Sequence, residues 1–486
     1  MESQPFKRAF WTLALAGLLL VLYPFLYRQS PFLQEHFRTY QISPAALQAA
    51  PADTLSVQDS TLALSAPEPP PKYDGRATLA AFYEVLHKQR EQIRIGHYGD
   101  SSIEGDLITG SFRDSLQRRF GGQGIGLAPV VNPISGFRRT LRHSFSDNWN
   151  HCYIGKENRQ ELPRGINGEY FTSWAEPDTT LQPDTPPEAD TLRAKGMEVE
   201  NDPAHWTFYR RATLFPGSSI FPSARLFYAA PQPDSTGYLD VAGRLFIRAG
   251  RENIAFELDD SAVVNEQILS TDPLRRLHLN FEIPPRQPIY GLSFESASGI
   301  IVDNFPSRGN SGAGLLQISQ STLRQFQNYL DYDLILMQFG LNALNEKMID
   351  YRWYEREMGH VVRHFRKAMP GMAIILIGPS DRAIKIGGSM QTDPSLPRIT
   401  AALRRVAEAN GTAFFSFYEA MGGQGSMIEW VEERQPRLAN TDYTHFNFTG
   451  ARKAALLLLD FLLEGYENHQ SEKTTPEESN RTTKDD

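Results

Sequence analysis

Cysteine is almost absent from this chain. Its 486 residues include a single cysteine, Cys152, so no disulfide can form within the chain and stability has to come from packing. One cysteine also argues against a zinc or iron–sulfur site built from several thiolates. No internal repeat is present in the sequence.

An excess of positive charge is lacking as well. The chain has 49 Lys and Arg residues against 57 Asp and Glu, a formal net charge of −8, and no long basic stripe. We therefore expect no nucleic-acid partner. With 41% hydrophobic and 22% charged residues, the composition is that of a globular protein. The length predicts two folded units plus tails.

One long uncharged run lies near the N-terminus. Residues 9–27 carry no charge, and Lys7 and Arg8 precede them. A run of this length is about what is needed to cross ~30 Å of hydrocarbon. The preceding positive charge favours an N-terminus in the cytoplasm and a remainder on the outer side. We predict a single-pass anchor over residues 1–30. A cleaved signal peptide is the alternative, but no small-x-small site follows the run.

The rest of the chain divides by composition. Residues 31–75, rich in Pro, Ala and Ser, are typical of an extended tether. The polar residues 467–486 predict a disordered tail. Residues 76–139 and 301–466 alternate short apolar strands with amphipathic helices, a pattern typical of a parallel sheet wrapped by helices. The strands expected there are 93–98, 334–339, 373–377 and 412–417.

Residues 140–300 have a different pattern. Strand-like segments at 244–249, 254–258, 277–281 and 289–294 are separated by Pro, Gly, Asp and Asn, with few helical stretches. This pattern predicts an all-β sandwich. Because both flanking segments are needed to complete one parallel sheet, we interpret the β unit as an insertion into the α/β unit.

A candidate nucleophile follows the first α/β strand. Gly99-Asp100-Ser101-Ser102 ends that strand and precedes a helical stripe, which places Ser101 at a strand-to-helix turn. There its own amide can stabilise a developing oxyanion. The alternative is that Ser101 and Asp100 are ordinary helix N-caps.

A candidate base precedes the last strong helix. Asp442 lies three residues before His445, so its carboxylate can fold back onto Nδ1 and leave the other nitrogen to take a proton from a serine. The alternative is a capping Asp beside a buried, satisfied His. His360 and His364 are four apart and could share a helix face, but no third metal ligand is evident. We expect no metal.

Two further segments point to the same edge of the sheet. Gln338-Phe339-Gly340-Leu341-Asn342 ends a strand, and the loop 307–313 follows a strand-like segment. Active sites of open α/β sheets gather at the carboxyl ends of strands. We therefore expect Asn342 and the loop amides near Ser101.

This order of motifs resembles the SGNH (GDSL-type) hydrolases. Their first, third and fifth blocks are Gly-Asp-Ser, Gly-x-Asn and Asp-x-x-His, which match residues 99–101, 340–342 and 442–445. Their second block supplies a glycine, matched best by Gly312, with Gly309 as the rival. The resemblance implies a flavodoxin-like parallel sheet with helices on both faces.

The resemblance also implies roles. Ser101 is expected to be the nucleophile, His445 the base and Asp442 its orienting partner. The Ser101 amide, Gly312 and Asn342 are expected to form the oxyanion hole. No cofactor is implied.

Within this class, the longer first block at residues 99–110 is similar to that of bacterial peptidoglycan O-acetylesterases, which also carry a carbohydrate-binding-module-like β insert. This implies a serine esterase that removes O-acetyl groups from peptidoglycan or another envelope polysaccharide. We expect it to be anchored in the bacterial inner membrane, with its catalytic domain in the periplasm or another extracytoplasmic space. Two alternatives stay open: an O-acetyltransferase on such a glycan, and a catalytically dead glycan-binding scaffold.

Overall fold

The structure, a computed structural model, describes residues 73–173, 205–249 and 252–474. The predicted membrane anchor at residues 1–30 lies outside these residues, as does most of the predicted tether. Among the residues that are described, no helix is both long and apolar enough to span a lipid bilayer.

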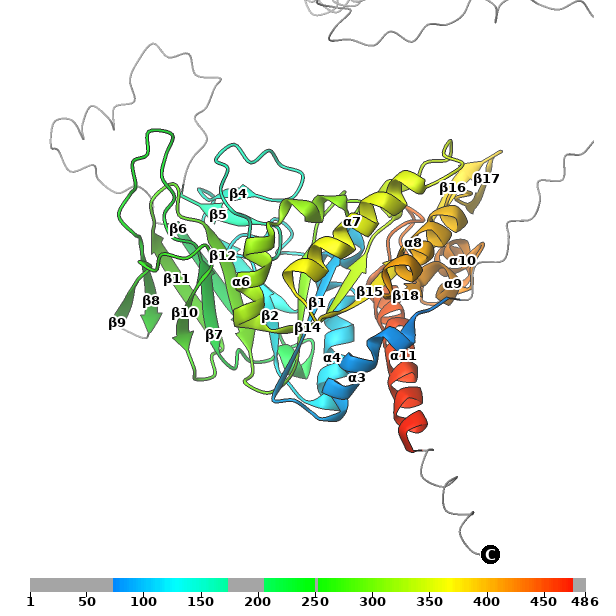
Figure 1. Cartoon of the computed structure of the whole chain (residues 1–486), viewed down its shortest axis with the longest axis horizontal. Helices are drawn as coiled ribbons and strands as arrows, with labels where there is room; N and C mark the ends of the chain where they lie inside the picture. The colour runs from blue at the N-terminus through cyan, green and yellow to red at the C-terminus, as the bar shows by residue number, and fades with distance from the viewer. Residues whose placement is uncertain (1–72, 174–204, 250–251, 475–486) are drawn as a thin grey trace, which may run out of the picture. The chain divides into compact units, whose positions relative to one another are not determined.

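Five parallel strands form a central sheet (Figure 1). Numbered along the chain, their spatial order is 2-1-3-4-5, which is the flavodoxin-like arrangement. The predicted parallel α/β fold is thereby confirmed. In spatial order the strands are β13 (Gly299–Pro306), β1 (Gln92–Gly99), β14 (Tyr332–Gln338), β15 (Ala373–Gly378) and β18 (Ala413–Ser416).

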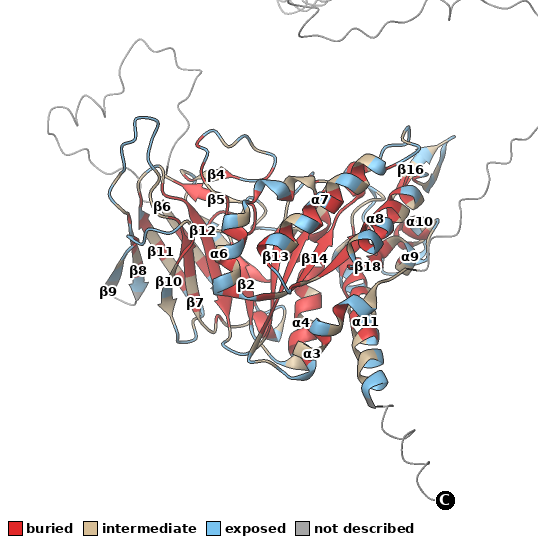
Figure 2. Cartoon of the chain, viewed as in Figure 1, coloured by how far each residue is buried: buried red, intermediate tan, exposed pale blue. Residues whose placement is uncertain are grey.

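Helices cover both faces of this sheet because its strands are apolar on both sides. On β14, Ile335 and Met337 pack in one hydrophobic cluster, whereas Leu334 and Leu336 pack in another. Figure 2 shows the result: buried strands lie between helices whose outer faces are exposed. The first cluster includes α6 (Gln320–Leu330), α7 (Arg352–Ala368) and α8 (Leu396–Asn410), and the second α3 (Ala80–His87), α4 (Thr109–Phe120) and α11 (Phe448–Thr474).

The insert consists of two antiparallel sheets packed around a separate core. Inward-facing residues of both sheets, such as Leu226 and Leu279, share one cluster, as predicted for a sandwich. One sheet contains β10 (Asn265–Ser270), β7 (Ala224–Tyr228), β12 (Ile289–Glu295), β5 (Tyr170–Thr172), β4 (Asn150–Cys152) and β2 (Gly124–Ala128). The other contains β3 (Leu141–Phe145), β6 (His205–Arg211), β11 (Arg276–Glu282), β8 (Arg244–Ala249) and β9 (Glu252–Glu257).

The sandwich begins earlier in the chain than expected. Strand β2 pairs with β12, so the boundary predicted at residue 140 falls after the first strand of the insert. The β2 sequence, Gly-Ile-Gly-Leu-Ala, contains glycines, which are depleted in strands, and this hides the strand in the sequence. The chain leaves α4 at Gly121 and returns at Gly299. There the Ile300 amide donates a hydrogen bond to the Gly121 carbonyl at 2.9 Å.

A buried ion network joins the sandwich to the parallel sheet. Arg94 of β1 is fully buried and pairs with Glu295 of β12 at 2.5 Å and with Asp303 of β13 at 2.6 Å. Arg225 of β7 also pairs with Glu295. Burial acts to raise the pKa of the Glu295 carboxyl, but the two arginines outweigh it and lower the pKa to about 2. Ionised groups therefore contribute to the contact between the two parts of the fold, beside the apolar contacts of Phe227 and Tyr290 with Phe326 of α6.

Helix α11 extends past the end predicted for the folded unit. It continues to Thr474, so the first part of the predicted tail, 467–486, is helical. Charged side chains of this extension have partners on the hydrolase: Glu467 accepts a hydrogen bond from Arg119 at 2.9 Å, and Nε2 of His469 lies 2.7 Å from Glu84. These pairs support a helix that lacks an apolar period.

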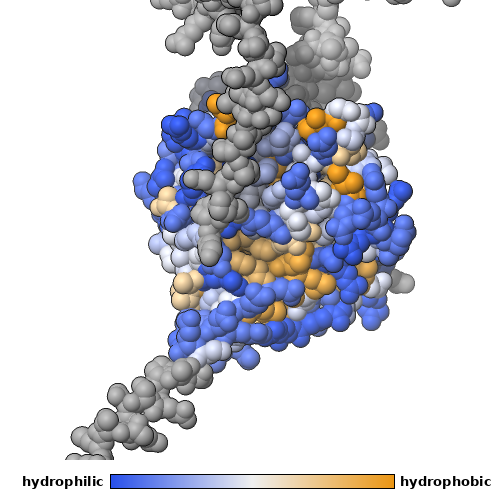
Figure 3. Space-filling view, turned by 90° about the vertical axis from the view of Figure 1, so that its right-hand side faces the viewer, coloured by the Kyte–Doolittle hydropathy of each residue, from blue (hydrophilic) through white to orange (hydrophobic). Residues whose placement is uncertain are grey.

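Short elements complete the described chain. Figure 3 looks onto the side that carries α9, α10 and α11, where hydrophobic residues gather in the middle of a mostly hydrophilic face. On α11, Leu456 is 41% exposed. The remaining short elements are η2 (Arg76–Leu79), η4 (Pro216–Ser218), β16 (Ala383–Ile386), β17 (Ser389–Thr392), α9 (Phe417–Met421), α10 (Ser426–Ile428) and η7 (Glu429–Glu433).

Candidate active site

Two loops of the site and the candidate nucleophile begin at one edge of the parallel sheet. Gly99, the last residue of β1, lies opposite Pro306 of β13 and Gln338 of β14 in strand register. The Ser307 amide donates a hydrogen bond to the Gly99 carbonyl at 2.8 Å. The segments that follow these strands therefore start side by side, as expected for the carboxyl ends of parallel strands.

Ser101 opens a short helix, η3 (Ser101–Asp106), directly after β1. The preceding Asp100 caps this helix and accepts a hydrogen bond from the backbone amide two residues on, at 2.9 Å. At the other end, buried Asp106 accepts two hydrogen bonds from Arg113 of α4, at 2.6 and 2.9 Å. The segment that carries Ser101 is thus held at both ends.

His445 lies in the loop that precedes α11. Asn447 fixes the end of this loop, because its Oδ1 accepts hydrogen bonds from the amides of Thr449 and Gly450 at 2.9 and 3.0 Å. This is helix N-capping. Asp442 folds back within the same loop, and its Oδ1 accepts a hydrogen bond from the His445 amide at 3.0 Å. The two side chains are therefore positioned by one turn of backbone.

Ser101, His445 and Asp442 form a continuous chain of hydrogen bonds. Oγ of Ser101 lies 3.0 Å from Nε2 of His445, and Nδ1 of His445 lies 2.8 Å from Oδ2 of Asp442. Since an ionised carboxylate only accepts hydrogen bonds, Nδ1 carries the hydrogen and Nε2 is left to accept the hydroxyl proton of Ser101. This tautomer is the one that general-base activation of a serine requires.

The His–Asp pair is open to solvent. The side chains of His445 and Asp442 are 40% and 49% exposed. Partial burial acts to raise the pKa of Asp442, but hydrogen bonds from the His445 amide and ring and from the Thr444 amide outweigh it and lower the pKa below its ordinary value. Asp442 is therefore ionised over a wide pH range, and the exposed edge is accessible to a bulky substrate.

The expected oxyanion donors lie at the same edge, and two of them have acceptors within the protein. Nδ2 of Asn342, in η6 (Leu341–Ala343), donates to Oδ2 of Asp100 at 3.1 Å and to the Asn310 carbonyl at 3.2 Å. The Gly312 amide donates to Oδ1 of Asn310 at 2.9 Å. For Asn342 or Gly312 to stabilise an oxyanion, these hydrogens must be shared with it. Their oxyanion role stays a prediction.

The structure distinguishes the two glycines considered for the second block. Gly312 has a φ of +104°, and a Cβ added there would lie 2.5 Å from Sδ of Met358. Gly309 also has a positive φ, of +74°, but a Cβ there would meet nothing within 4 Å. Only Gly312 therefore combines a left-handed backbone with close packing that excludes a side chain.

The capping role of Asp100 was offered by the sequence as an alternative and is confirmed, whereas the contact of Asp100 with Asn342 and the role of Asn310 were missed. Asp100 is 2% exposed, and its burial raises the pKa of its carboxyl. Oδ1 of Asn310 accepts hydrogen bonds from the amides of Gly312 and Gly314, at 2.9 and 3.2 Å, and so shapes the entry to η5 (Ala313–Gln317). The only signals in the sequence were an Asp beside the nucleophile and a Gly-Asn-Ser-Gly turn.

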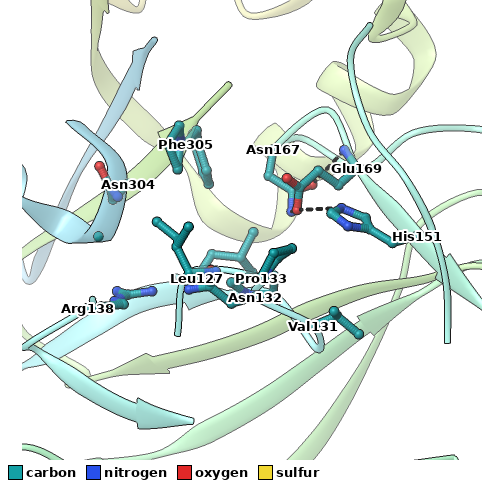
Figure 4. Close-up of a pocket in the computed structure, with 14 residues that line it drawn as sticks. Leu127, Val131, Asn132, Pro133, Arg138, His151, Asn167, Glu169, Asn304 and Phe305 are labelled. Atoms are coloured by element: carbon teal, nitrogen blue, oxygen red, sulfur yellow. Dashed lines mark hydrogen bonds and ion pairs between the residues drawn. The ribbon is translucent and has the colours of Figure 1, made fainter. Parts of the chain in front are cut away.

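A hollow of about 330 Å³ lies beside η3 and is lined by both parts of the fold. Figure 4 shows a smaller cavity next to this hollow, and several residues line both. Among these shared residues, Glu169 lies 3.6 Å from Nε2 of His151 and accepts a hydrogen bond from Asn167. At the rim, Arg308 makes a two-pronged ion pair with Glu104 of η3. The hollow therefore borders the helix that Ser101 opens, and it combines apolar walls with charged side chains.

No metal arrangement is evident in the described ranges, which hold no group of three or more His, Cys, Asp or Glu side chains placed around one ion. His364, considered for a metal from its spacing, instead has Nε2 2.8 Å from the Ile318 carbonyl.

Solved structures resemble this fold. The structure of a peptidoglycan O-acetylesterase aligns with a TM-score of 0.60 and 21% sequence identity, over 82% of this chain and 98% of that chain. Two other esterases align with low TM-scores. A family two carbohydrate esterase from Cellvibrio japonicus scores 0.25 with 8% identity, over 68% of this chain and 98% of its own. The structure of an acetyl xylan esterase aligns with a TM-score of 0.24 and 15% sequence identity, over 33% of this chain and 81% of that chain. No protein-family model and no curated protein matches the sequence.

The 2-1-3-4-5 sheet, with Ser101, His445 and Asp442 at its carboxyl edge, is the arrangement expected from the resemblance to SGNH (GDSL-type) hydrolases. The chain shares its fold with the peptidoglycan O-acetylesterase. The alignment covers 82% of this chain, which is more than the α/β unit alone can supply, so the likeness extends to the inserted sandwich. The predicted resemblance is confirmed at the level of the fold.

Proposed function

We propose that this protein is a membrane-anchored serine esterase that removes O-acetyl groups from peptidoglycan or another envelope polysaccharide. The observation that carries the proposal is the hydrogen-bonded chain Ser101–His445–Asp442, with contacts of 3.0 and 2.8 Å, at an exposed sheet edge. Likeness of fold to a peptidoglycan O-acetylesterase supports the choice of substrate class.

The reaction begins with attack by the serine. Oγ of Ser101 bonds to the acetyl carbonyl carbon while its proton passes to Nε2 of His445. The Asp442 carboxylate stabilises the imidazolium that forms. The bond between the acetyl carbon and the sugar oxygen then breaks, and His445 returns the proton to that oxygen. The deacetylated sugar leaves, and the acetyl group stays on Ser101.

The second half repeats these steps with water. His445 accepts a proton from a water molecule, whose oxygen attacks the acetyl carbon on Ser101. When the bond to Oγ breaks, His445 gives the proton back to Ser101 and acetate leaves. Both halves pass through a tetrahedral oxyanion, for which the Ser101 and Gly312 amides and the Asn342 side chain are the proposed donors. The loss of one such donor typically slows the reaction by about 10²–10³-fold.

Two features support a polymeric substrate outside the cytoplasm. The exposed His–Asp pair and the hollow beside η3 leave room for sugar residues on either side of an ester. The uncharged run at residues 9–27, preceded by two basic residues, supports an anchor with the hydrolase on the outer side of a bacterial inner membrane. The long tether that follows would give the enzyme reach toward an envelope polymer.

The test is acetate release by the full chain, purified in neutral detergent, from p-nitrophenyl acetate and from O-acetylated peptidoglycan. We expect the wild type and a Ser321→Ala control, changed at an exposed serine of α6, to turn over both substrates. We expect Ser101→Ala to turn over neither while it unfolds at an unchanged temperature. Equal activity of Ser101→Ala and the control would refute the mechanism.

The same assay separates the rival activities. Turnover of p-nitrophenyl acetate that increases when sugar hydroxyl acceptors are added, with acetylated sugar as the product, would identify an acetyltransferase. A folded wild type that releases no acetate from either substrate and still binds peptidoglycan would identify a scaffold.

A further inference from the structure

Three arginines face one another across the strands β3, β6 and β11 of the sandwich. Strand register places Arg142 directly opposite Arg210, and Arg210 directly opposite Arg276. All three side chains are exposed. Like charges on directly opposed residues destabilise a sheet. A row of three cations therefore costs stability, and the cost is recovered when an anion binds.

These arginines belong to a larger basic hollow. It has a volume of about 950 Å³, and six of its nine lining residues are arginines. Within the described part of the chain none of the six makes an ion pair, although arginines elsewhere in the sandwich do, such as Arg244 with Glu282 and Arg225 with Glu266. The protein as a whole is acidic, with a formal net charge of −8, so this concentration of positive charge is local. The six are Arg139, Arg142, Arg210, Arg211, Arg275 and Arg276.

The arginine hollow continues toward the active site. Arg139 and Leu214 line it and also line a second hollow of about 300 Å³. That second hollow reaches Gly105 of η3, the helix that Ser101 opens, and Phe448 at the start of α11, three residues after His445. A path lined by the sandwich at one end and by the catalytic loops at the other thus runs along the protein.

An aromatic pair stands on this path. The rings of Phe137 and Phe448 stack with centroids 5.1 Å apart, and the side chains remain 46% and 39% exposed. The guanidinium of Arg139 lies 4.6 Å from the centre of the Phe448 ring. Partly exposed aromatic rings beside a cation suit a chain of sugar rings that carries negative groups.

We propose that the arginine hollow binds the anionic groups of the acetylated glycan and holds the polymer while an acetyl ester lies at Ser101; this rests on the proposed esterase function. Guanidinium groups pair with carboxylates through two parallel hydrogen bonds, so a row of them matches a polymer with repeated carboxylates. Peptidoglycan carries such carboxylates on its peptides. A concave path that leads to the catalytic loops fits a polymer strand better than it fits the flat surface of a bilayer.

The test compares two triple variants of the full chain with equal loss of charge. Arg142→Gln/Arg210→Gln/Arg276→Gln removes the row. Arg248→Gln/Arg324→Gln/Arg356→Gln removes three exposed arginines elsewhere. With O-acetylated peptidoglycan we expect the row variant to raise KM about 10-fold or more, with kcat little changed. With p-nitrophenyl acetate, which carries no charge, both variants should match the wild type. An equal KM for the two variants on peptidoglycan would overturn the proposal.

A binding measurement keeps this test separate from the esterase hypothesis. Ser101→Ala protein, with and without the row substitutions, is sedimented with peptidoglycan whose carboxylates are free or converted to amides. We expect the row substitutions to weaken binding only to the free-carboxylate polymer, whether or not the wild type turns over esters. If they leave that binding intact but abolish the affinity for phosphatidylglycerol in neutral detergent micelles, the hollow faces lipid and the proposal fails.

Discussion

The side-chain amide of Asn342 donates a hydrogen bond to the carboxylate of Asp100, 3.1 Å away, although 242 residues separate them in sequence. The same carboxylate caps the helix that Ser101 opens. One buried group therefore orients both the candidate nucleophile and the candidate oxyanion donor. Asp100 is in this sense a positioning residue.

This relationship predicts a defect from a nearly isosteric change. In Asp100→Asn the cap oxygen remains, but the acceptor for Asn342 is weakened or replaced by a second amide. We expect kcat for p-nitrophenyl acetate to fall roughly 10- to 100-fold, as small misplacements of catalytic groups do, with KM nearly unchanged. Asp350→Asn, at an exposed residue, is the control. If Asp100→Asn keeps full activity while Asn342→Ala loses it, Asn342 does not depend on Asp100.

The two glycines of the second-block loop give a matched pair. Gly312→Ala places a Cβ against Met358, whereas Gly309→Ala places one in open space. An alanine at either position has to adopt a left-handed backbone, which lowers the free energy of unfolding by about 1 kcal/mol. We expect Gly312→Ala to lose kcat strongly, because its amide has to move, and Gly309→Ala to retain it. Steady-state kinetics at a temperature where both proteins are folded would check this; the reverse pattern would assign the loop role to Gly309.

Replacement of Asp442 tests the tautomer of His445. In Asp442→Asn the loop amides keep an oxygen acceptor, but the side-chain amide can face Nδ1 and leave the hydrogen on Nε2. His445 then cannot accept the proton of Ser101, and we expect kcat to fall by up to ~10⁴-fold. The ¹⁵N chemical shifts of the imidazole would report the change of tautomer. A loss of less than tenfold would show that Asp442 is dispensable for orientation.

The buried Glu295 predicts a pH dependence of stability. Its pKa is lowered from 4.5 to about 2 in the folded protein, so its ionised form stabilises the fold above pH ~4.5, and this contribution is lost as the pH falls toward ~2. Glu295→Gln should be less stable at neutral pH by roughly 3 kcal/mol, because a buried ion pair is broken. It should also lose less stability between these two pH values. Denaturant unfolding at several pH values measures both; parallel curves for the two proteins would contradict the assignment.

Much of the fold follows from local pattern. Apolar strands such as residues 373–377 alternate with helices of clear periodicity, and this is enough to predict a parallel sheet wrapped by helices. Strand β2 was missed because glycine weakens the pattern. The helical extension of α11 was missed because it depends on Arg119 and Glu84, which lie more than 300 residues away in sequence.

The candidate site was predictable where one short motif carries the geometry. Asp442 and His445 are three residues apart, so their contact is a property of one loop. The partners of Asn342 and of Gly312 could not be predicted, because they depend on how the first and second blocks meet in space. Asn310 accepts hydrogen bonds from both Gly312 and Asn342, and no spacing in the sequence predicts these contacts.

The hydrogen bond between Ile300 and Gly121 means that the sandwich enters and leaves the hydrolase through neighbouring peptides. Removal of everything between them leaves two chain ends that a tight turn can join, and the order of the parallel strands is unaffected. The sandwich is thus one continuous insertion, although its Phe227 and Tyr290 share a hydrophobic cluster with Phe326 of the hydrolase. A hydrolase of this kind can gain or change a glycan-holding surface through one recombination event, provided that the new module covers Phe326 and brings a second carboxylate, beside Asp303, for Arg94.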